Sequence, residues 1–411
     1  MRLFFFDTPH TPPTTREDDL AVLRLIRSRR VGPTTFHRLI AEHGSAAAAL
    51  DALPAIAAAA GIEGYAPCPE PVALAELKAG HRARARLICI DSPDYPAALR
   101  QIDDAPPVLW MRGNAAALTR PVVAVVGARN ASSLGLRMAR GMALALAEAG
   151  ITVAAGLARG IDTVAHEASL PHGTVAVMAG GIDVIYPAEN RALADRICDT
   201  GCLLTEQPPG LDPVARHFPA RNRIVSGISA GVVVIEAAHR SGTLITARCA
   251  ADQGREVMAV PGHPIDARAA GCNALIRDGA VLVRNAEDVL AVIGLGEGWQ
   301  GGVPADPDGQ RRKPRLQAAH GCETEVTARP RKHGRLGEIA ANAAPDASAD
   351  ASIPPQALRR QLLGLLGPSP TEEDSLIRDL GVAPARLAPV ILDLELDGVV
   401  VRLPGGRIAL A

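Results

Sequence analysis

Aromatic residues are scarce in this sequence and make up 2% of its 411 residues. Their scarcity disfavours a binding surface built mainly on the stacking of nucleotide bases. The chain also lacks an excess of charge of either sign, because 43 lysines and arginines almost cancel 44 aspartates and glutamates. A polyanionic partner would therefore have to be held by a local basic patch, since the charge of the whole chain does not attract it.

The seven cysteines are scattered and include no C-x-x-C pair, which indicates buried thiols in a reducing cytosol. Cys198 and Cys202 lie four residues apart, but no third ligand is near, so we predict no metal and no other cofactor. The opening "MRLFFFD" is too short and too quickly polar for a signal peptide. No apolar run of membrane-spanning length is free of glycines and charges. We therefore expect a cytoplasmic protein without a membrane partner.

The texture of the sequence divides the chain into five segments. Between residues 121 and 290, about six or seven short valine-rich runs such as "PVVAVVG" alternate with helix-length segments, which predicts a doubly wound parallel sheet. We predict a loose N-terminal segment (1–17), a helical module (18–85), this α/β domain (86–295), a flexible linker (296–352) and a winged-helix domain (353–411).

The segments outside the α/β domain offer three further places at which DNA could bind, and at each of them another interpretation is favoured. In the helical module, Val31-Gly32-Pro33 resembles the turn of a helix-hairpin-helix element, although a plain helix connection is favoured. The linker has two basic clusters, at 311–315 and 329–335, for which a solvated linker is favoured over an auxiliary phosphate contact. The third winged-helix helix has several acidic residues and one arginine, Arg386, so a protein-binding or regulatory role is favoured over duplex DNA.

Polar residues gather where the predicted strands end, and the carboxyl ends of parallel strands share one edge of a sheet. The loop after the first strand, "VVGARNASSLG", supplies Gly127, Arg129 and Ser132. The next two loops supply Arg159 and Arg191. Two later stretches add Arg221, Asn222 and Arg223, and then Ser241, Gly242 and Thr243 at the start of a helix. Free amides at a helix start favour an anion, so these residues together predict a phosphate-binding pocket.

The same loops offer no evident reaction centre. Candidate acids and bases are Asp162, Asp183, Glu206 and Glu236, while His166 is interpreted as a satisfied helix histidine. Glu236 could pair with Arg221 or Arg223, in which case that arginine would only shape the site. No phosphate loop of the G-x-x-x-x-G-K-[ST] type, no G-x-G-x-x-G fingerprint and no metal constellation occurs in the sequence. Binding is therefore favoured over catalysis.

Several of these stretches together resemble the bacterial DNA-processing protein A family, also called Smf. They cover roughly residues 90 to 290 and include "VVGARNASSLG", "GLARGIDTVAHEASL", "GGIDVIYPAEN", "FPARNRIVSGIS", "EAAHRSGTLITARCAADQGREVMAVPG" and "GCNALIRDGA". More loosely, the helical start resembles the sterile-alpha-motif-like domain of some members. The tail resembles the family's winged-helix extension.

The resemblance implies an extended Rossmann-like domain that binds single-stranded DNA without strong sequence preference and forms a homodimer. It implies protection of incoming strands during natural transformation and loading of the recombinase RecA, without enzyme activity. The family's basic pocket corresponds to Arg129 and to Arg159, Arg221, Asn222 and Arg223, with the helix start at Ser241, Gly242 and Thr243 in the same pocket. One departure is Ala188, where the family often has a lysine; Arg191 could replace that charge.

Two other functions are weighed against this one. Nucleoside-monophosphate phosphoribohydrolases have a related sheet and use a P-G-G-x-G-T-x-x-E loop with a catalytic glutamate. The equivalent "RSGTLITAR" lacks the paired glycines and the glutamate. A protein-interaction scaffold acting through the winged helix is the other alternative, and it predicts that deletion of residues 354–411 abolishes function.

Overall fold

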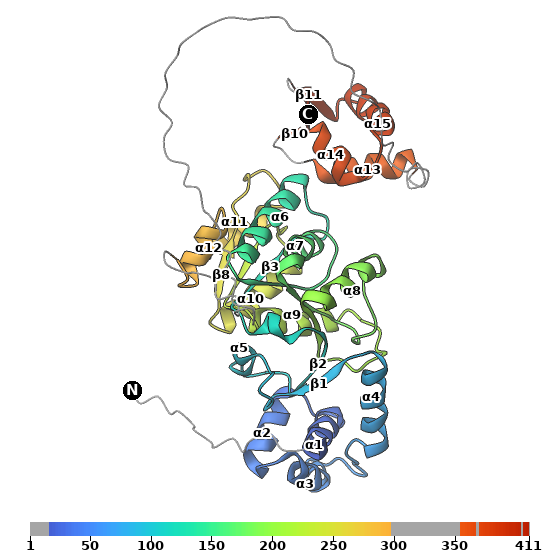
Figure 1. Ribbon diagram of the computed structural model, residues 1–411, viewed down its shortest axis with the longest axis vertical. Helices are drawn as coiled ribbons and strands as arrows, with labels where there is room; N and C mark the ends of the chain where they lie inside the picture. Colours follow the sequence, from blue (N-terminus) through green and yellow to red (C-terminus); the bar gives the residue numbers. More distant parts are fainter. Residues whose placement is uncertain (1–15, 297–353, 367–369, 404–405, 411) are drawn as a thin grey trace, which may run out of the picture.

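The computed structural model describes residues 16–296, 354–366, 370–403 and 406–410 (Figure 1). Its N-terminal part is a bundle of four helices: α1 (Arg16–Arg27), α2 (Pro33–His43), α3 (Ala46–Ala59) and α4 (Glu70–Arg82). Pro33 occupies the first turn of α2, where its missing N–H is not needed, and Ser45 caps α3 by accepting from the amide of Ala48. Phe36, Leu39 and neighbouring leucines form the buried core of this bundle.

The central domain is built on a nine-stranded sheet in the order β1-β2-β6-β5-β4-β3-β7-β8-β9. The strands from β3 to β9 are all parallel to one another. Their bounds are β1 (Arg86–Cys89), β2 (Val108–Gly113), β3 (Val122–Val126), β4 (Thr152–Ala155), β5 (Thr174–Val177), β6 (Cys202–Thr205), β7 (Gly231–Val234), β8 (Glu256–Ala259) and β9 (Val281–Leu282).

The parallel, doubly wound sheet predicted from the valine-rich runs is confirmed. The sequence did not predict that β1 and β2 extend this sheet. These strands pair antiparallel with each other, and β2 pairs antiparallel with β6. The sheet is therefore mixed, with an antiparallel edge next to the helical module.

Helices cover both faces of the sheet. Val123 and Val125 of β3 belong to one apolar cluster, with α6 (Ser133–Glu148), α7 (Ile161–Ser169) and α12 (Ala286–Val292). Ala124 and Val126 face a second cluster, with α9 (His217–Gly227) and α10 (Thr243–Asp252). This alternation along one buried strand is the packing that a doubly wound fold requires. The remaining elements are α5 (Ala97–Arg100), α8 (Arg191–Thr200), α11 (Ala270–Arg277), η1 (Ala115–Leu118), η2 (Leu170–His172) and η3 (Ala188–Asn190).

The C-terminal part has the winged-helix architecture that the sequence predicts, with one extra short strand. Its elements are α13 (Pro355–Leu365), β10 (Thr371–Glu372), α14 (Glu373–Leu380), α15 (Pro384–Leu396), β11 (Val400–Leu403) and β12 (Arg407–Leu410). Strand β12 lies between β10 and β11. Leu362, Leu376, Ile391 and other buried residues form a separate apolar core. The domain lies beyond the ends of α6 and α11, across the sheet domain from the helical bundle (Figure 1). The two basic clusters predicted in the linker lie outside the described residues.

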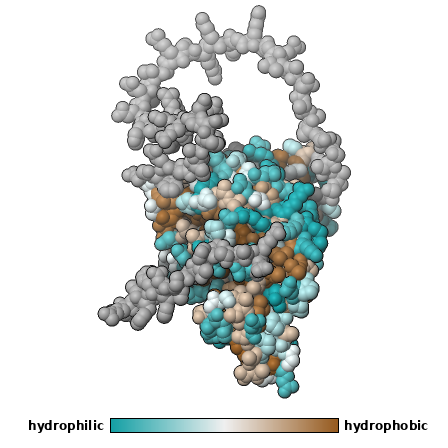
Figure 2. All heavy atoms as spheres, turned by 60° about the horizontal axis from the view of Figure 1, so that its bottom comes forward, coloured by the Kyte–Doolittle hydropathy of each residue, from teal (hydrophilic) through white to brown (hydrophobic). Residues whose placement is uncertain are grey.

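Within the described residues, no helix has both the length and the apolar character needed to span a bilayer. On the face seen in Figure 2, apolar and polar residues are mixed over the described surface.

Candidate nucleic-acid interface

The candidate site lies at the carboxyl edge of the parallel strands, where the chain leaves β3, β4, β5 and β7. Strand β3 lies between β4 and β7, so the connection from β3 to β4 and the connection from β7 to β8 run in opposite directions across the sheet. Such a switch point opens a crevice in which doubly wound proteins bind their ligands. The structure brings the loops after these strands together, as the sequence predicts. Their side chains, however, divide into an exposed set and an internally bonded set.

Three arginines form the exposed set. Arg129 follows β3, Arg159 follows β4, and Arg191 begins α8 after β5, and all three are exposed. Arg159 forms an ion pair with Glu189, and both side chains are more than half exposed, at 65% and 53%. A pair so exposed is weak, so the Arg159 guanidinium can exchange Glu189 for another anion at little cost.

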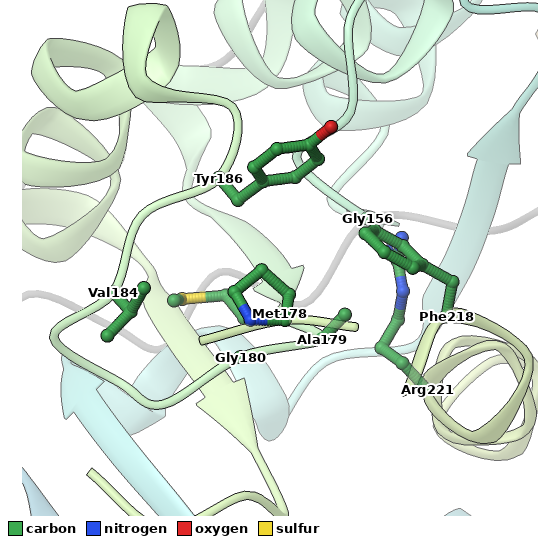
Figure 3. A pocket seen from close by; sticks show the side chains of 9 residues that line it. Gly156, Met178, Ala179, Gly180, Val184, Tyr186, Phe218 and Arg221 are labelled. Carbon is green, nitrogen blue, oxygen red and sulfur yellow. The ribbon is translucent and has the colours of Figure 1, made fainter. Parts of the chain in front are cut away.

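Two aromatic side chains lie beside these arginines. The rings of Tyr186 and Phe218 meet edge to face with centroids 5.8 Å apart, and Tyr186 is 55% exposed. The Arg129 guanidinium lies 5.3 Å from the centroid of Phe218, within cation–π range. The contact holds the Arg129 side chain over the loop edge. Tyr186 and Phe218 also line a small pocket, together with Arg221, which lies beside Phe218 (Figure 3).

Arg221 is buried beneath this pocket. A Cβ on Gly156 would come within 1.3 Å of its Nη1, so only glycine at 156 leaves room for the guanidinium. Nη1 donates to the carbonyl of Val177 at 3.0 Å, and Nε has no hydrogen-bond partner among the described residues. Burial lowers the pKa of Arg221, and the nearby carboxylate of Asp162 opposes that effect.

Asp162 uses its carboxylate to hold the loop after β4. Its Oδ2 accepts from the amide of Gly156 at 2.9 Å and from that of Ala158 at 3.3 Å. Burial raises the pKa of Asp162, while Arg221 and these two amides act against the rise. Because a carboxylate of the protein already occupies these amides, they are not available to a phosphate.

Glu236 holds the start of α6 in the same way, and the alternative in which it pairs with Arg221 or Arg223 is not what the structure shows. Its carboxylate accepts from the amide of Ser132 at 2.9 Å and from the Ser132 hydroxyl. Gly135 makes room, because a Cβ there would lie 2.4 Å from the carboxyl carbon. Burial raises the pKa of Glu236, and the Ser132 hydrogen bonds oppose the rise. Ser132 therefore bonds inward as a helix cap.

Arg223 points away from Arg221 and bonds to other acids. Its guanidinium donates to the carbonyl of Asp104 at 2.7 Å, lies 3.4 Å from the Asp104 carboxylate, and forms an ion pair with Glu206. The Arg223 side chain is only 12% exposed. Asn222, between the two arginines, is half-buried. The structure therefore does not bring Arg221 and Arg223 to one surface.

The start of α10 is tied to the loop after β3. The Thr243 hydroxyl donates to the carbonyl of Gly127 at 2.9 Å, and Ser241 accepts from the Thr243 amide at 3.2 Å. Gly242 is exposed, and a Cβ placed there would meet nothing within 4 Å. Gly127 packs under Ile161, where a Cβ would approach to 2.6 Å. These contacts fix the relative positions of the loops at the switch point.

The remaining titratable candidates form hydrogen bonds within the protein. His166 is buried with Nδ1 2.9 Å from the Thr174 hydroxyl, and burial lowers its pKa to about 3. Its Nε2 has no hydrogen-bond partner among the described residues, so the histidine is only half satisfied. Asp183 accepts from the amide of Gly210. Among the described residues, no group of three or more His, Cys, Asp or Glu is arranged to hold a metal ion. Sequence reasoning missed Asp104 and the role of Gly156, whose local sequences carry no signal for either contact.

Comparison with known families identifies the chain. Residues 86–294 match the model of DNA recombination-mediator protein A. The chain belongs to this family. Residues 16–79 match a DprA-like N-terminal HHH domain, and residues 344–406 match a DprA winged helix domain. The first of these two matches agrees with the helical N-terminal module and supports the helix-hairpin-helix alternative at Gly32 over the plain helix connection that the sequence favoured.

Relatives with established names support the assignment. Protein Smf of Escherichia coli is 35% identical over 327 residues, which cover 79% of this chain and 77% of that protein. DNA processing protein DprA of Streptococcus pneumoniae is 46% identical over 48% of this chain and 70% of its own length. The solved X-ray structure of DprA from Streptococcus pneumoniae has a TM-score of 0.51 at 41% identity and covers 54% of this chain and 77% of that one. A solved DNA processing protein A from Helicobacter pylori, described for its single-stranded DNA binding mode, has a TM-score of 0.47 at 26% identity over 51% of this chain and 97% of that one.

Proposed function

We propose that this recombination mediator binds single-stranded DNA across the carboxyl edge of its parallel strands, without strong sequence preference. The observation that carries the proposal is the set of three exposed arginines, Arg129, Arg159 and Arg191, on three successive strand-exit loops. A guanidinium offers a forked, permanently charged donor that binds phosphate oxygens whatever base is attached.

The aromatic pair limits how the bases take part. Tyr186 and Phe218 are the aromatic side chains at these loops, and Arg129 covers part of Phe218. One or two bases can stack there, and the rest of the affinity has to come from phosphates. The internally bonded residues shape the loops that carry the exposed arginines. They are Ser132, Arg221, Arg223, Ser241 and Thr243. Gly127, Asn222 and Gly242 belong to the same loops and helix starts and complete the predicted set.

A salt titration tests the proposal. Binding of a labelled oligothymidine is measured between about 50 and 200 mM salt, beside the matching duplex. For single strands, each phosphate contact adds about 0.7 to the slope of log affinity against log salt. Arg129→Ala combined with Arg159→Ala should therefore flatten the slope by about 1.4 and weaken binding.

The matched control is Arg196→Ala, in the same α8 that begins with Arg191. Arg196 is exposed but lies further along the helix, away from the loop edge. It should leave both affinity and slope unchanged. Equal losses in Arg196→Ala and in the double variant would refute the site. If the double variant binds as tightly as the wild type, the strand contacts another surface of the protein.

We also infer that the site binds without chemistry. This is supported by the internal use of its acids, since Asp162 and Glu236 each accept hydrogen bonds from backbone amides. A carboxylate that is committed to holding a loop or a helix start is poorly placed to take a proton from a substrate. Release of free base from nucleoside monophosphates by the purified chain would overturn this inference.

Two partners follow from the family resemblance and are part of the proposal: the recombinase RecA, loaded onto the bound strand in the cytoplasm, and a second copy of the chain in a homodimer. Light scattering at micromolar concentration tests the homodimer, and a strict monomer counts against it. RecA filament formation on strands coated with a single-strand-binding protein tests loading. No acceleration by the chain would refute that role.

A further inference from the structure

The winged-helix domain contacts the sheet domain at the edge that carries the proposed site. Arg268, in the loop between β8 and α11, donates to the carbonyl of Leu366 at 2.8 Å and to the carbonyl of Gly364. These carbonyls belong to the last turn and C-cap of α13. Carbonyls at a helix C-terminus lack intrahelical partners and carry negative partial charge, so a guanidinium is well matched to them.

A second contact reaches the loop after β3. A Cβ placed on Gly364 would lie 3.4 Å from the side-chain nitrogen of Asn130. Asn130 directly follows Arg129 in the chain. Helix α14 packs against α6, the helix that this loop opens (Figure 1). The winged-helix domain therefore lies over one flank of the switch point, beside an arginine of the proposed site.

The chemistry of this contact suits a reversible interaction. The winged-helix domain has its own apolar core, so it does not need the sheet domain to bury its apolar residues. The hydrogen bonds that join the two domains come from Arg268, and a guanidinium can exchange carbonyl partners for water. The domain has no excess of positive charge to attract phosphates, because residues 354–411 contain seven acidic residues and six arginines.

We propose that the winged-helix domain is an intramolecular gate: it closes over the β3 side of the strand-exit edge, with Arg268 as its latch, and a bound single strand displaces it. The inference rests on the proposed function and adds its regulation. The closed and DNA-bound states are mutually exclusive, because a strand that crosses from Arg191 past Arg129 toward α10 meets α13 at Asn130.

With the gate, the apparent affinity for DNA equals the affinity of the open chain multiplied by the fraction of chains that are open. A closed population of about nine-tenths weakens binding about tenfold, and anything that holds the winged helix elsewhere restores it. A protein that binds the winged-helix domain would therefore increase DNA binding at a site that it does not touch.

A reversible cross-link tests the gate in the full chain. Asn130→Cys and Gly364→Cys place two thiols at the contact, in a Cys322→Ser background that removes a cysteine outside the described residues. Mild oxidation should form the disulfide, which peptide mass mapping identifies. The oxidised protein should bind oligothymidine at least about tenfold more weakly than the reduced protein, and dithiothreitol should restore binding. Gly364→Cys alone should respond to neither treatment.

Each other outcome is decisive. If the disulfide forms and the affinity for oligothymidine does not change, strand and winged helix bind together and the gate is refuted. If no disulfide forms, the closed arrangement is not populated and the gate is equally refuted. If the reduced protein binds no oligothymidine while the disulfide forms, the proposed function fails and closure of the winged helix still stands.

Removing the latch gives the opposite effect. Arg268→Ala should strengthen oligothymidine binding up to about tenfold, because the open fraction rises. The matched control is Arg277→Ala in α11, an exposed arginine that forms an ion pair with its neighbour Asp278, and it should leave the affinity unchanged. Weaker binding by Arg268→Ala would show that Arg268 contacts the strand, and the latch would then be refuted.

Discussion

Replacement of Arg223 by alanine should destabilise the sheet domain, because this arginine is bonded inside the protein. Its guanidinium has three interactions, with the Asp104 carbonyl, the Asp104 carboxylate and the Glu206 carboxylate. Loss of one partner of a buried ion pair costs about 3–5 kcal/mol. The Arg223 and Glu206 side chains are 12% and 17% exposed, so solvent replaces little of the lost interaction.

The expected loss is near the lower end of that range, about 3 kcal/mol in the free energy of unfolding. Glu206 keeps a second cation, Arg27, whose charge also lowers the pKa of this carboxyl. Burial outweighs both arginines and leaves the pKa of Glu206 raised, so the carboxylate is already costly to keep charged. Arg223→Ala should raise that pKa further.

Urea unfolding, followed by tryptophan fluorescence in a Trp299→Phe background, measures the effect. The signal then comes from Trp110, a fully buried residue of β2 whose indole N–H donates to Glu76. Arg216→Ala is the matched control, since Arg216 is exposed in the same stretch, and its effect should stay within about 0.5 kcal/mol. An Arg223→Ala protein as stable as the wild type, yet defective in DNA binding, would refute the internal role of Arg223.

Two further predictions concern buried groups of the same domain. His166 has its pKa lowered to about 3, so the unfolded chain binds a proton that the folded chain does not between about pH 6.5 and 3. His166→Asn should therefore reduce the fall in unfolding free energy on acidification below pH 6 by about 1.4 kcal/mol per pH unit, measured by urea unfolding; parallel pH profiles would contradict this. Gly156→Ala should cost about 3 kcal/mol, because its Cβ would lie 1.3 Å from Arg221, whereas Gly242→Ala, in open space, should cost under about 0.5 kcal/mol in the same assay.

The parallel sheet could be predicted because its strands are buried on both faces. Val122 to Val126 form an unbroken apolar run, and such runs separated by helix-length segments are local signals. The antiparallel strands β1 and β2 carry no comparable signal. Their place in the sheet depends on pairing of β2 with β6, more than 80 residues away in the sequence, which local patterns do not encode.

The site could be predicted as a location, because the ends of parallel strands must meet at one edge. The direction of each side chain could not. Arg221 and Arg223 are two residues apart in α9, about 200° around the helix axis, so they face opposite sides. One enters the cradle left by Gly156, and the other meets Asp104 and Glu206. Three-dimensional packing decides which donors remain for a ligand.

The number of donors in the sequence therefore overstates the number of phosphate contacts. Asp162 occupies amides of the loop after β4, Glu236 occupies donors at the start of α6, and Glu206 occupies the Arg223 guanidinium within α9. Arg129, Arg159 and Arg191 remain exposed. Three phosphate contacts predict a slope of log affinity against log salt of about −2 for a short oligothymidine, whereas contacts from five arginines would give about −3.5. A slope of the second size in the wild type would mean that Arg221 and Arg223 leave their internal partners when DNA binds. The loss of a buried ion pair on binding would then have to be offset by the strand itself.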